Sequence, residues 1–224
     1  FLKSEGSLWA VGWNRFGQLG NGTYSTDAPY GTNRPEQIIV SNVTAIAAGG
    51  YHSLFLKSDG SLWGMGYNAY GQLGDGTYNS TNLPEPIVAS NVTAIAAGYN
   101  HSLFIKTDGS LWGMGRNNFG QLGDGSTNNI NLPAQIMASN VTAISAGHSH
   151  SLFLKADGSL WGMGRNTHGQ LGDGSTNNIS LPEQIVVSNV AAISAHGSNS
   201  LFLKTDGSVW GMGSNAYGQL AQST

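Results

Sequence analysis

The chain has 224 residues, of which 33 are glycine and none is cysteine, and its formal net charge is −3. This balance excludes a basic surface that could hold nucleic acid or an anionic membrane. The lack of cysteine excludes disulfides, thiolate zinc sites and cysteine nucleophiles, and no apolar run approaches the ~18 residues of a membrane span. Only 9% of residues are charged, and the abundance of glycine and small polar residues predicts an all-β body with tight turns.

A repeated segment organises the chain. The sequence Gly-Ser-Leu-Trp, or Gly-Ser-Val-Trp in the last copy, begins at Gly6, Gly60, Gly109, Gly158 and Gly207. The intervals are 54, 49, 49 and 49 residues, and extra residues around 27–31 lengthen the first. Self-similarity at this period indicates a repeat architecture. We therefore expect one array, residues 1–224, with units at approximately 1–42, 43–91, 92–140, 141–189 and 190–224.

Each unit predicts four short antiparallel strands. In the second unit we expect them at residues 43–46, 52–57, 61–66 and 84–88. The dipeptide Asp59-Gly60 predicts a two-residue hairpin turn in which both central residues have positive φ. A long loop, 67–83, leads to the fourth strand, which should be short. Its prolines, Pro84 and Pro86, indicate an edge strand because proline cannot donate to a central ladder.

Four strands repeated every 40 to 50 residues are typical of propeller blades. The apolar residues Phe55, Leu62, Trp63 and Met65 put bulk on both faces of the predicted sheet, which suits a blade packed between neighbours. The second and third strands occur five times, but the first and fourth occur only four times. We therefore predict an all-β fold, a β-propeller of four-stranded antiparallel blades present as an incomplete arc of about four to five blades.

Three motifs carry a family resemblance. They are Ala-Ala-Gly-x-x-His-Ser-Leu, Asp-Gly-Ser-Leu-Trp-Gly-x-Gly and Asn-x-x-Gly-Gln-Leu-Gly-Asp-Gly, and together they cover essentially the whole chain. This pattern resembles the regulator-of-chromosome-condensation repeat, especially its bacterial branch. The resemblance implies a ring that typically has seven blades. Its members include a nucleotide exchange factor for a nuclear GTPase, a plant ultraviolet-B photoreceptor and a secreted bacterial inhibitor of β-lactamases, so the fold alone does not select a function.

A seven-blade ring at this period needs about 343 residues. Either further blades on a longer chain or association with another copy would complete it, and we favour the longer chain. The five repeated tryptophans, one per unit, are interpreted as core packing residues and not as a light-absorbing cluster.

The charged residues give little indication of catalysis. Most carboxylates recur once per unit at turn or loop positions, as Asp59 and Asp108 do, which favours turn residues over an acid/base pair. His52, His101 and His150 recur before Ser-Leu, and we expect a ring nitrogen to bind the backbone of the preceding turn. His148 and His150 offer two nitrogens to a metal, but no third ligand is evident. We expect no enzyme activity, metal site or cofactor.

Comparison of the copies indicates a candidate binding face. The connections between first and second strands, and between third and fourth strands, should emerge on one side, where the repeats differ. Aromatic and arginine side chains on one face are typical of protein-binding hot spots. The alternative for a ring such as Phe16 or Tyr70 is that it packs under its own loop. The candidate partner-binding residues are Trp13, Arg15, Tyr51, Tyr67, Tyr99, Arg116, His148 and Arg165.

These observations favour a non-catalytic scaffold that binds a protein or another macromolecule through the variable loop face. A guanine-nucleotide exchange factor for a small GTPase and a carbohydrate-binding propeller are the alternatives. A protein is the preferred partner, and we expect neither nucleic-acid binding nor membrane insertion. The bacterial resemblance implies an extracellular or cell-surface location.

Overall fold

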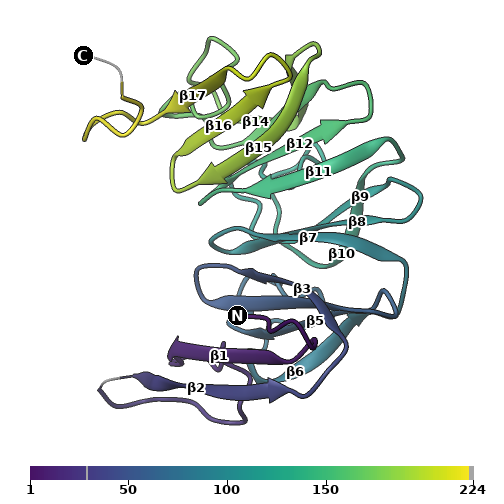
Figure 1. The fold of residues 1–224 in the computed structure, drawn as a ribbon. Helices are drawn as coiled ribbons and strands as arrows, with labels where there is room; N and C mark the ends of the chain where they lie inside the picture. Colours follow the sequence, from purple (N-terminus) through teal and green to yellow (C-terminus); the bar gives the residue numbers. More distant parts are fainter. Residues whose placement is uncertain (29, 222–224) are drawn as a thin grey trace.

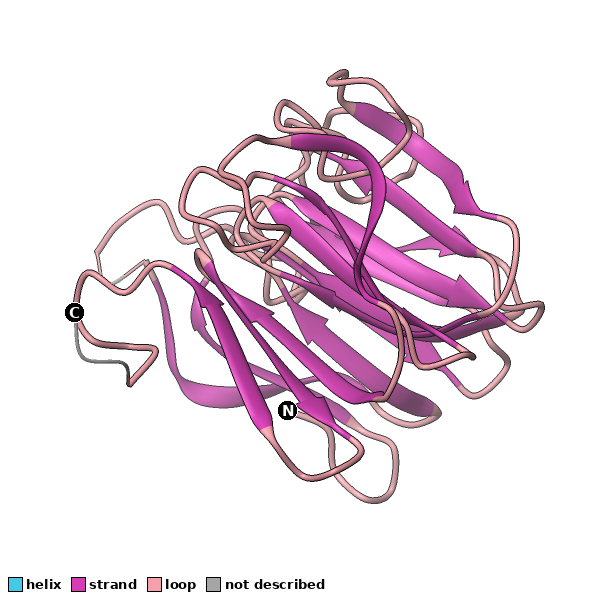
Figure 2. Cartoon of the chain, turned by 90° about the horizontal axis from the view of Figure 1, so that it is seen from above, coloured by secondary structure: helices cyan, strands magenta, loops and turns pink. Residues whose placement is uncertain are grey.

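The computed structural model describes residues 1–28 and 30–221, and its secondary structure there consists of 17 β-strands without a helix (Figure 2). No helix of these residues, therefore, is long and apolar enough to cross a membrane. The first nine strands are β1 (Leu8–Trp13), β2 (Gly31–Ile39), β3 (Val43–Ala48), β4 (His52–Lys57), β5 (Leu62–Gly66), β6 (Thr81–Val88), β7 (Val92–Ala97), β8 (His101–Lys106) and β9 (Leu111–Gly115). The others are β10 (Ile130–Met137), β11 (Val141–Ala146), β12 (His150–Lys155), β13 (Leu160–Gly164), β14 (Ile179–Val186), β15 (Val190–His196), β16 (Asn199–Lys204) and β17 (Val209–Gly213).

The strands form five antiparallel sheets that follow one another in chain order along a curved array (Figure 1). Three sheets have four strands, β3–β6, β7–β10 and β11–β14, and the flanking sheets are β1–β2 and β15–β17. This confirms the predicted arc of four-stranded blades with partial blades at both ends. The expected second strand of the first unit is reduced to one bridge, between Leu2 and Leu8.

The first strands of successive blades contact one another, β3 with β7, β7 with β11 and β11 with β15, so the blades converge there. The fourth strand is longer than we predicted: β6 starts at Thr81, ahead of Pro84. Register shifts in its pairing with β5 allow the strand to continue past the prolines. As expected for a proline-bearing strand, β6 lies at the edge of its sheet.

The hairpin turn differs from the prediction. Only Gly60 has a positive φ, of 77°, whereas Asp59 does not. The Gly60 N–H donates to the Lys57 carbonyl at 3.0 Å, and the Asp59 carboxylate accepts from the Ser61 N–H at 2.9 Å. The turn is therefore a longer one with glycine in the left-handed position. Asp59 contributes its carboxylate as a hydrogen-bond acceptor in this turn, and it does not adopt a positive φ.

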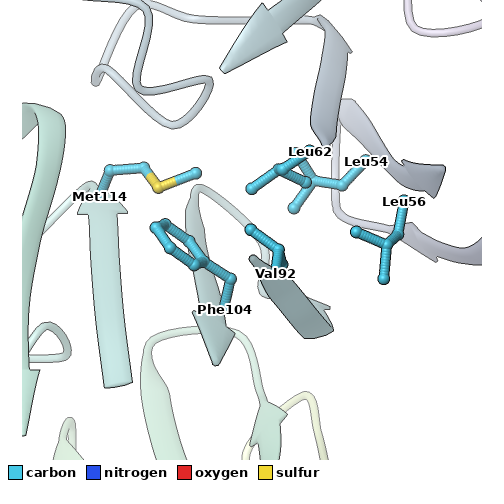
Figure 3. Close-up of a cluster of buried hydrophobic side chains, with 6 residues drawn as sticks. All are labelled: Leu54, Leu56, Leu62, Val92, Phe104 and Met114. Carbon is cyan, nitrogen blue, oxygen red and sulfur yellow. The ribbon is translucent and has the colours of Figure 1, made fainter. Parts of the chain in front are cut away.

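The hydrophobic core lies between the blades. Figure 3 shows one such layer, in which side chains of β4 and β5 meet side chains of β7, β8 and β9. The first blade contributes Leu54, Leu56 and Leu62, and the next contributes Val92, Phe104 and Met114. Equivalent layers join the other neighbouring blades. Each blade thus has a leucine face toward the following blade and a Val/Phe/Met face toward the preceding one.

The repeated histidines also join the blades, which corrects our expectation of a bond to the preceding turn. His52 Nε2 lies 2.9 Å from the Ser102 hydroxyl of the next blade, and that hydroxyl donates to the Gln72 carbonyl at 2.7 Å. Because the serine proton is used in this way, His52 must donate through Nε2. His101–Ser151 and His150–Ser200 repeat the arrangement. The Nδ1 atoms of all three histidines are buried without a hydrogen-bond partner.

Both ends of the arc expose the faces that are buried elsewhere. Leu201 and Val209 of the last sheet are 43% and 69% exposed, whereas their equivalents Leu152 and Leu160 are fully buried. At the other end, Phe1 and Val11 are exposed in the same way. Exposed apolar sheet faces of this kind promote association.

We therefore predict that the 224-residue chain self-associates when it is produced alone. Val209→Lys should reduce this association, because a charge on the exposed leucine face must be desolvated on contact. Light scattering after size exclusion measures the effect. Val187→Lys is the control, since Val187 is 76% exposed but lies outside the sheets. A wild-type chain that remains monomeric at high concentration would contradict the prediction.

A second prediction concerns acid stability. Burial lowers the pKa of His52 and His150 to about 4 and that of His101 to about 3. Below pH ~6.5 the unfolded chain binds protons on these residues while the folded chain does not, so the free energy of unfolding falls as pH falls through that window. His101→Asn, which copies Asn199 of the last repeat, should lessen the loss between pH 7 and 5 by about 2 kcal/mol.

Urea unfolding at the two pH values tests this prediction. The matched control is His168→Asn, because His168 is an exposed loop residue. An identical pH dependence in His101→Asn and the wild type would show that the buried histidine does not contribute.

Candidate functional site

The variable loops share one side of the arc. Tyr51 directly precedes β4 and Asp59 follows its end, so the connections at Tyr51 and at the hairpin lie at opposite ends of the strand. The loop face consists of the connections between first and second strands, at 49–51, 98–100, 147–149 and 197–198, and of those between third and fourth strands, at 14–28 with 30, 67–80, 116–129 and 165–178. Seven of the eight residues predicted to bind a partner belong to it, and the eighth, Trp13, is the last residue of β1 and directly precedes it.

A buried asparagine organises each long loop of this face. Asn68 is fully buried; its Oδ1 accepts from the Leu73 N–H at 2.9 Å, and its Nδ2 donates to the Asp75 carboxylate at 3.0 Å. Asn117 and Asn166 make the same bonds in the next two loops. The loop backbone is therefore fixed by its own polar groups, and the residues that point outward are not needed for its shape.

Aromatic and arginine side chains from the loops of three successive blades surround a hollow of about 330 Å³. We call this hollow and its wall the aromatic cup. Its residues are Trp13, Arg15, Phe16, Tyr51, Tyr67, Tyr70, Tyr99, Asn100 and Arg116. Six of the eight predicted residues thus line one hollow, and His148 and Arg165 do not.

The aromatic rings of the cup pack mostly edge to face. Tyr51 is central: its ring centroid lies 5.2 Å from that of Trp13, 5.3 Å from Phe16 and 5.1 Å from Tyr99. The Tyr99 hydroxyl donates to the Tyr51 hydroxyl at 2.5 Å. Such pairs hold the rings in fixed orientations. The cup is therefore ordered before any partner binds.

His148 continues this line of rings beyond the cup. It stacks on Tyr99 with centroids 4.2 Å apart, and its Nδ1 lies 2.9 Å from the Ser149 hydroxyl. Tyr99 and His148 also line a second hollow of about 360 Å³, formed mainly by Ala and Gly residues where the inner strands end. The two hollows are thus adjacent, with Tyr99 common to both.

A ladder of contacts between blades places the arginines. The Phe16 ring lies 4.7 Å from Tyr67, which begins the next long loop. In the following blades the partner is an arginine: Arg116 lies over Tyr70 at 5.0 Å and Arg165 over Phe119 at 5.3 Å. Packing within the ring's own loop is therefore only part of the arrangement. Tyr70 contacts Tyr67 of its own loop, with ring centroids 6.0 Å apart, and it also contacts Arg116 of the next blade.

The pKa directions reflect these neighbours. Burial, together with the charges of Arg165 and Arg116, lowers the pKa of His148. The hydrogen bond to Tyr51 and burial raise the pKa of Tyr99, and burial with the nearby Tyr70 raises that of Tyr67. His148 is therefore neutral at pH 7 and both phenols are protonated. The two arginines provide the positive charge on this part of the loop face.

The cup includes residues that we did not predict. Phe16 and Tyr70 line it as well, and the aromatic residue that recurs at this position in most copies is the sequence feature that indicates them. Asn100 lies between the predicted Tyr99 and the repeated His101, but nothing in the sequence distinguishes it from the many other asparagines of the chain. Its side-chain Oδ1 is buried without a hydrogen-bond partner.

The repeated tryptophans lie away from the loop face; four of them are partly buried, and Trp210 of the last sheet is exposed. Trp63 stacks on Phe55 with centroids 6.1 Å apart, and the Lys57 ammonium lies 3.9 Å from the ring. The same trio recurs in the other full blades, so the repeated lysine covers the exposed side of each indole. Among the described residues, no group of three or more His, Cys, Asp or Glu is placed to hold a metal ion.

The fold and the repeated motifs match a known family. The family model described as the RCC1-like domain matches residues 1–224. The chain belongs to the RCC1-like domain family. Among solved structures, yeast RCC1 (Prp20), crystallised bound to Kap60, has a TM-score of 0.81 at 26% identity, over 96% of this chain and 53% of that one. Human WBSCR16 has a TM-score of 0.80 at 25% identity, over 92% of this chain and 56% of that one.

Curated members of the RCC1-like family match over shorter stretches. The ultraviolet-B receptor UVR8 of Arabidopsis thaliana is 36% identical over 72 residues, which is 32% of this chain and 16% of the receptor. A homologue of the X-linked retinitis pigmentosa GTPase regulator in Caenorhabditis elegans is 38% identical over 86 residues, 35% of this chain and 6% of that protein. The chain thus spans about half of the RCC1-like structures and a small part of these relatives.

The asparagine scaffold gives a third prediction. Asn117→Ala should lower the free energy of unfolding by about 2–3 kcal/mol, because it leaves the Leu122 N–H without its acceptor and removes one of the donors to the Asp124 carboxylate. Urea unfolding measures the loss, and hydrogen exchange at Leu122 should become faster. The adjacent, exposed Asn118→Ala is the control. Equal effects of the two substitutions would contradict the assigned role.

Proposed function

We propose that this chain is part of a non-catalytic propeller scaffold that binds another protein through its loop face. The aromatic cup is the observation that carries the proposal, because it combines ordered aromatic rings with arginines in one hollow. Trp, Tyr and Arg are the residue types that contribute most often to protein-binding hot spots. The loops that carry them are held rigid by buried asparagines, so binding would cost little conformational entropy.

The polar groups that catalysis would require have other roles. His52, His101 and His150 are buried in bonds between blades. The hairpin carboxylates Asp59 and Asp108 accept from the backbone of the serine two residues later. These contacts support a structural role for both sets and favour a binding protein over an enzyme.

The two alternatives have weaker support. Yeast Prp20p has been described together with its binding properties to Gsp1p and histones, but this chain covers only 55% of that protein. Exchange of a nucleotide on a GTPase would therefore be a function of a larger ring. Carbohydrate binding uses open aromatic faces, and Trp13, at 40% exposed, is the cup residue that best offers one.

A bacterial, extracellular or cell-surface location is part of this proposal. It is supported by the resemblance of the motifs to the bacterial branch of the repeat, and a chain without cysteine is compatible with export. The relatives described above come from a plant, a nematode, yeast and human. The full-length gene would test this part of the proposal, through its source and the presence of an export signal.

The fourth prediction tests the loop face. Capture of binding proteins from the source organism supplies the partner, and isothermal calorimetry measures its affinity for variants. Alanine at Trp13, Tyr67, Arg116 or Arg165 should weaken binding by about 2 kcal/mol or more for at least one of them, the usual size of a hot spot. Circular dichroism should show that the fold is retained.

Substitutions on the opposite side are the control. Asp59→Asn and Asp108→Asn change a charge at the hairpin turns and should leave the affinity unchanged. If these variants lost binding and the loop-face variants did not, the assigned face would be wrong. Binding of glycans that depends on Trp13, without capture of any protein, would favour the carbohydrate alternative.

A further inference from the structure

The charge of the aromatic cup is one-sided. Arg15 and Arg116 belong to its wall, and no Asp or Glu does. In the part of the chain that the structure describes, Arg15, Arg116 and Arg165 form no ion pair with a carboxylate. The loop acids Asp75 and Asp124 accept hydrogen bonds within their own loops. The cup thus offers positive charge that the protein itself does not neutralise.

The guanidinium groups are held in place by rings. Arg116 lies over Tyr70 at 5.0 Å, and Arg15 lies 5.9 Å from Phe16 and 6.0 Å from Tyr30. A guanidinium stacked on a ring keeps its N–H donors at its edge, where they match the two oxygens of a carboxylate. Because these side chains are already positioned, they lose little freedom when an anion binds.

The order of the blades separates the two arginines. Arg15 comes from the first long loop, Tyr67 and Tyr70 from the second, and Arg116 from the third. The floor between the two charges is therefore aromatic. An occupant that fits this order has an acidic group at each end and a large apolar side chain between them.

One further polar group suits a peptide backbone. The Tyr51 hydroxyl accepts from Tyr99, so its own proton is available to a carbonyl of the partner.

We infer that the aromatic cup binds an acidic segment of a protein partner, in which carboxylates flank a large apolar side chain. One carboxylate binds Arg116, the other binds Arg15, and the apolar side chain packs on the tyrosines between them. The volume of about 330 Å³ suits a few side chains and not a folded element. This inference rests on the proposed function, since it names the chemistry that the same face recognises.

Synthetic peptides test the inference without a known partner. The probe is a short blocked peptide with Glu-Phe-Glu at its centre, and its counterparts carry Gln-Phe-Gln or Glu-Ala-Glu. Titrations into the 15N-labelled chain, followed by NMR, give the affinities. We expect Glu-Phe-Glu to bind and to change the amide chemical shifts of Tyr67, Asn100 and Arg116. Each counterpart should bind at least about tenfold more weakly.

Protein variants locate the binding. Arg116→Gln should weaken binding of Glu-Phe-Glu by about tenfold or more, and Tyr67→Ala should do likewise. Arg34→Gln is the matched control, because it removes the same charge from an exposed position in β2, outside the cup. Raising the salt concentration should weaken Glu-Phe-Glu and leave Gln-Phe-Gln unchanged.

Several results would overturn the inference. They are equal binding of the Glu and Gln peptides, binding that Arg34→Gln reduces as much as Arg116→Gln, absence of binding at millimolar peptide, and binding only of a phosphoserine counterpart. A captured protein whose affinity depends on Tyr67 but is insensitive to Arg116→Gln and to salt would overturn it too. That last result would leave the proposed function standing, so the two failures are distinguishable.

Discussion

The fold depends on the burial of apolar side chains between neighbouring blades. Each four-stranded sheet is covered on both sides, with leucines such as Leu103 and Leu111 against Phe153 and Met163 of the next blade. A blade by itself would expose both faces, so its stability comes from its neighbours, as in other repeat proteins. The histidine-to-serine hydrogen bonds cross the same interfaces. Because a hydrogen bond is directional and apolar packing is not, these bonds fix the alignment of one blade relative to the next.

This arrangement explains why the structure separates into a constant and a variable part. The constant part is everything that one blade presents to another: the apolar layers, the His–Ser pairs and the glycines beside them. At Gly98, for example, a side chain would collide with the His101 ring. The variable part is the loop face, where positions such as Tyr67 and Arg116 have little influence on the packing of the sheets. Residues there are free to serve recognition.

Much of the fold could be predicted from the sequence because repetition shows which positions are equivalent. The 49-residue spacing and the apolar residues on both faces of each predicted sheet predicted the blades, and the differences between copies predicted the loop face. The histidine bonds could not be predicted, because the sequence does not show which group a histidine ring faces. The serine partner of His52 lies 50 residues away in the chain. The hairpin was misjudged because Asp-Gly is compatible with two turn types. Asn100 lines the cup together with residues of the two preceding blades, and no local sequence pattern shows that arrangement.

The buried asparagines have a further consequence for how such a protein changes over generations. Because Asn68, Asn117 and Asn166 hold their loops through the backbone and through neighbouring polar groups, the first residue of each loop can be tyrosine in one copy and arginine in the next without a new loop shape. Duplication of a blade therefore duplicates a ready display position as well as a structural unit. A recognition surface can therefore diversify one blade at a time, and each substitution at such a position lowers the stability of the fold only a little.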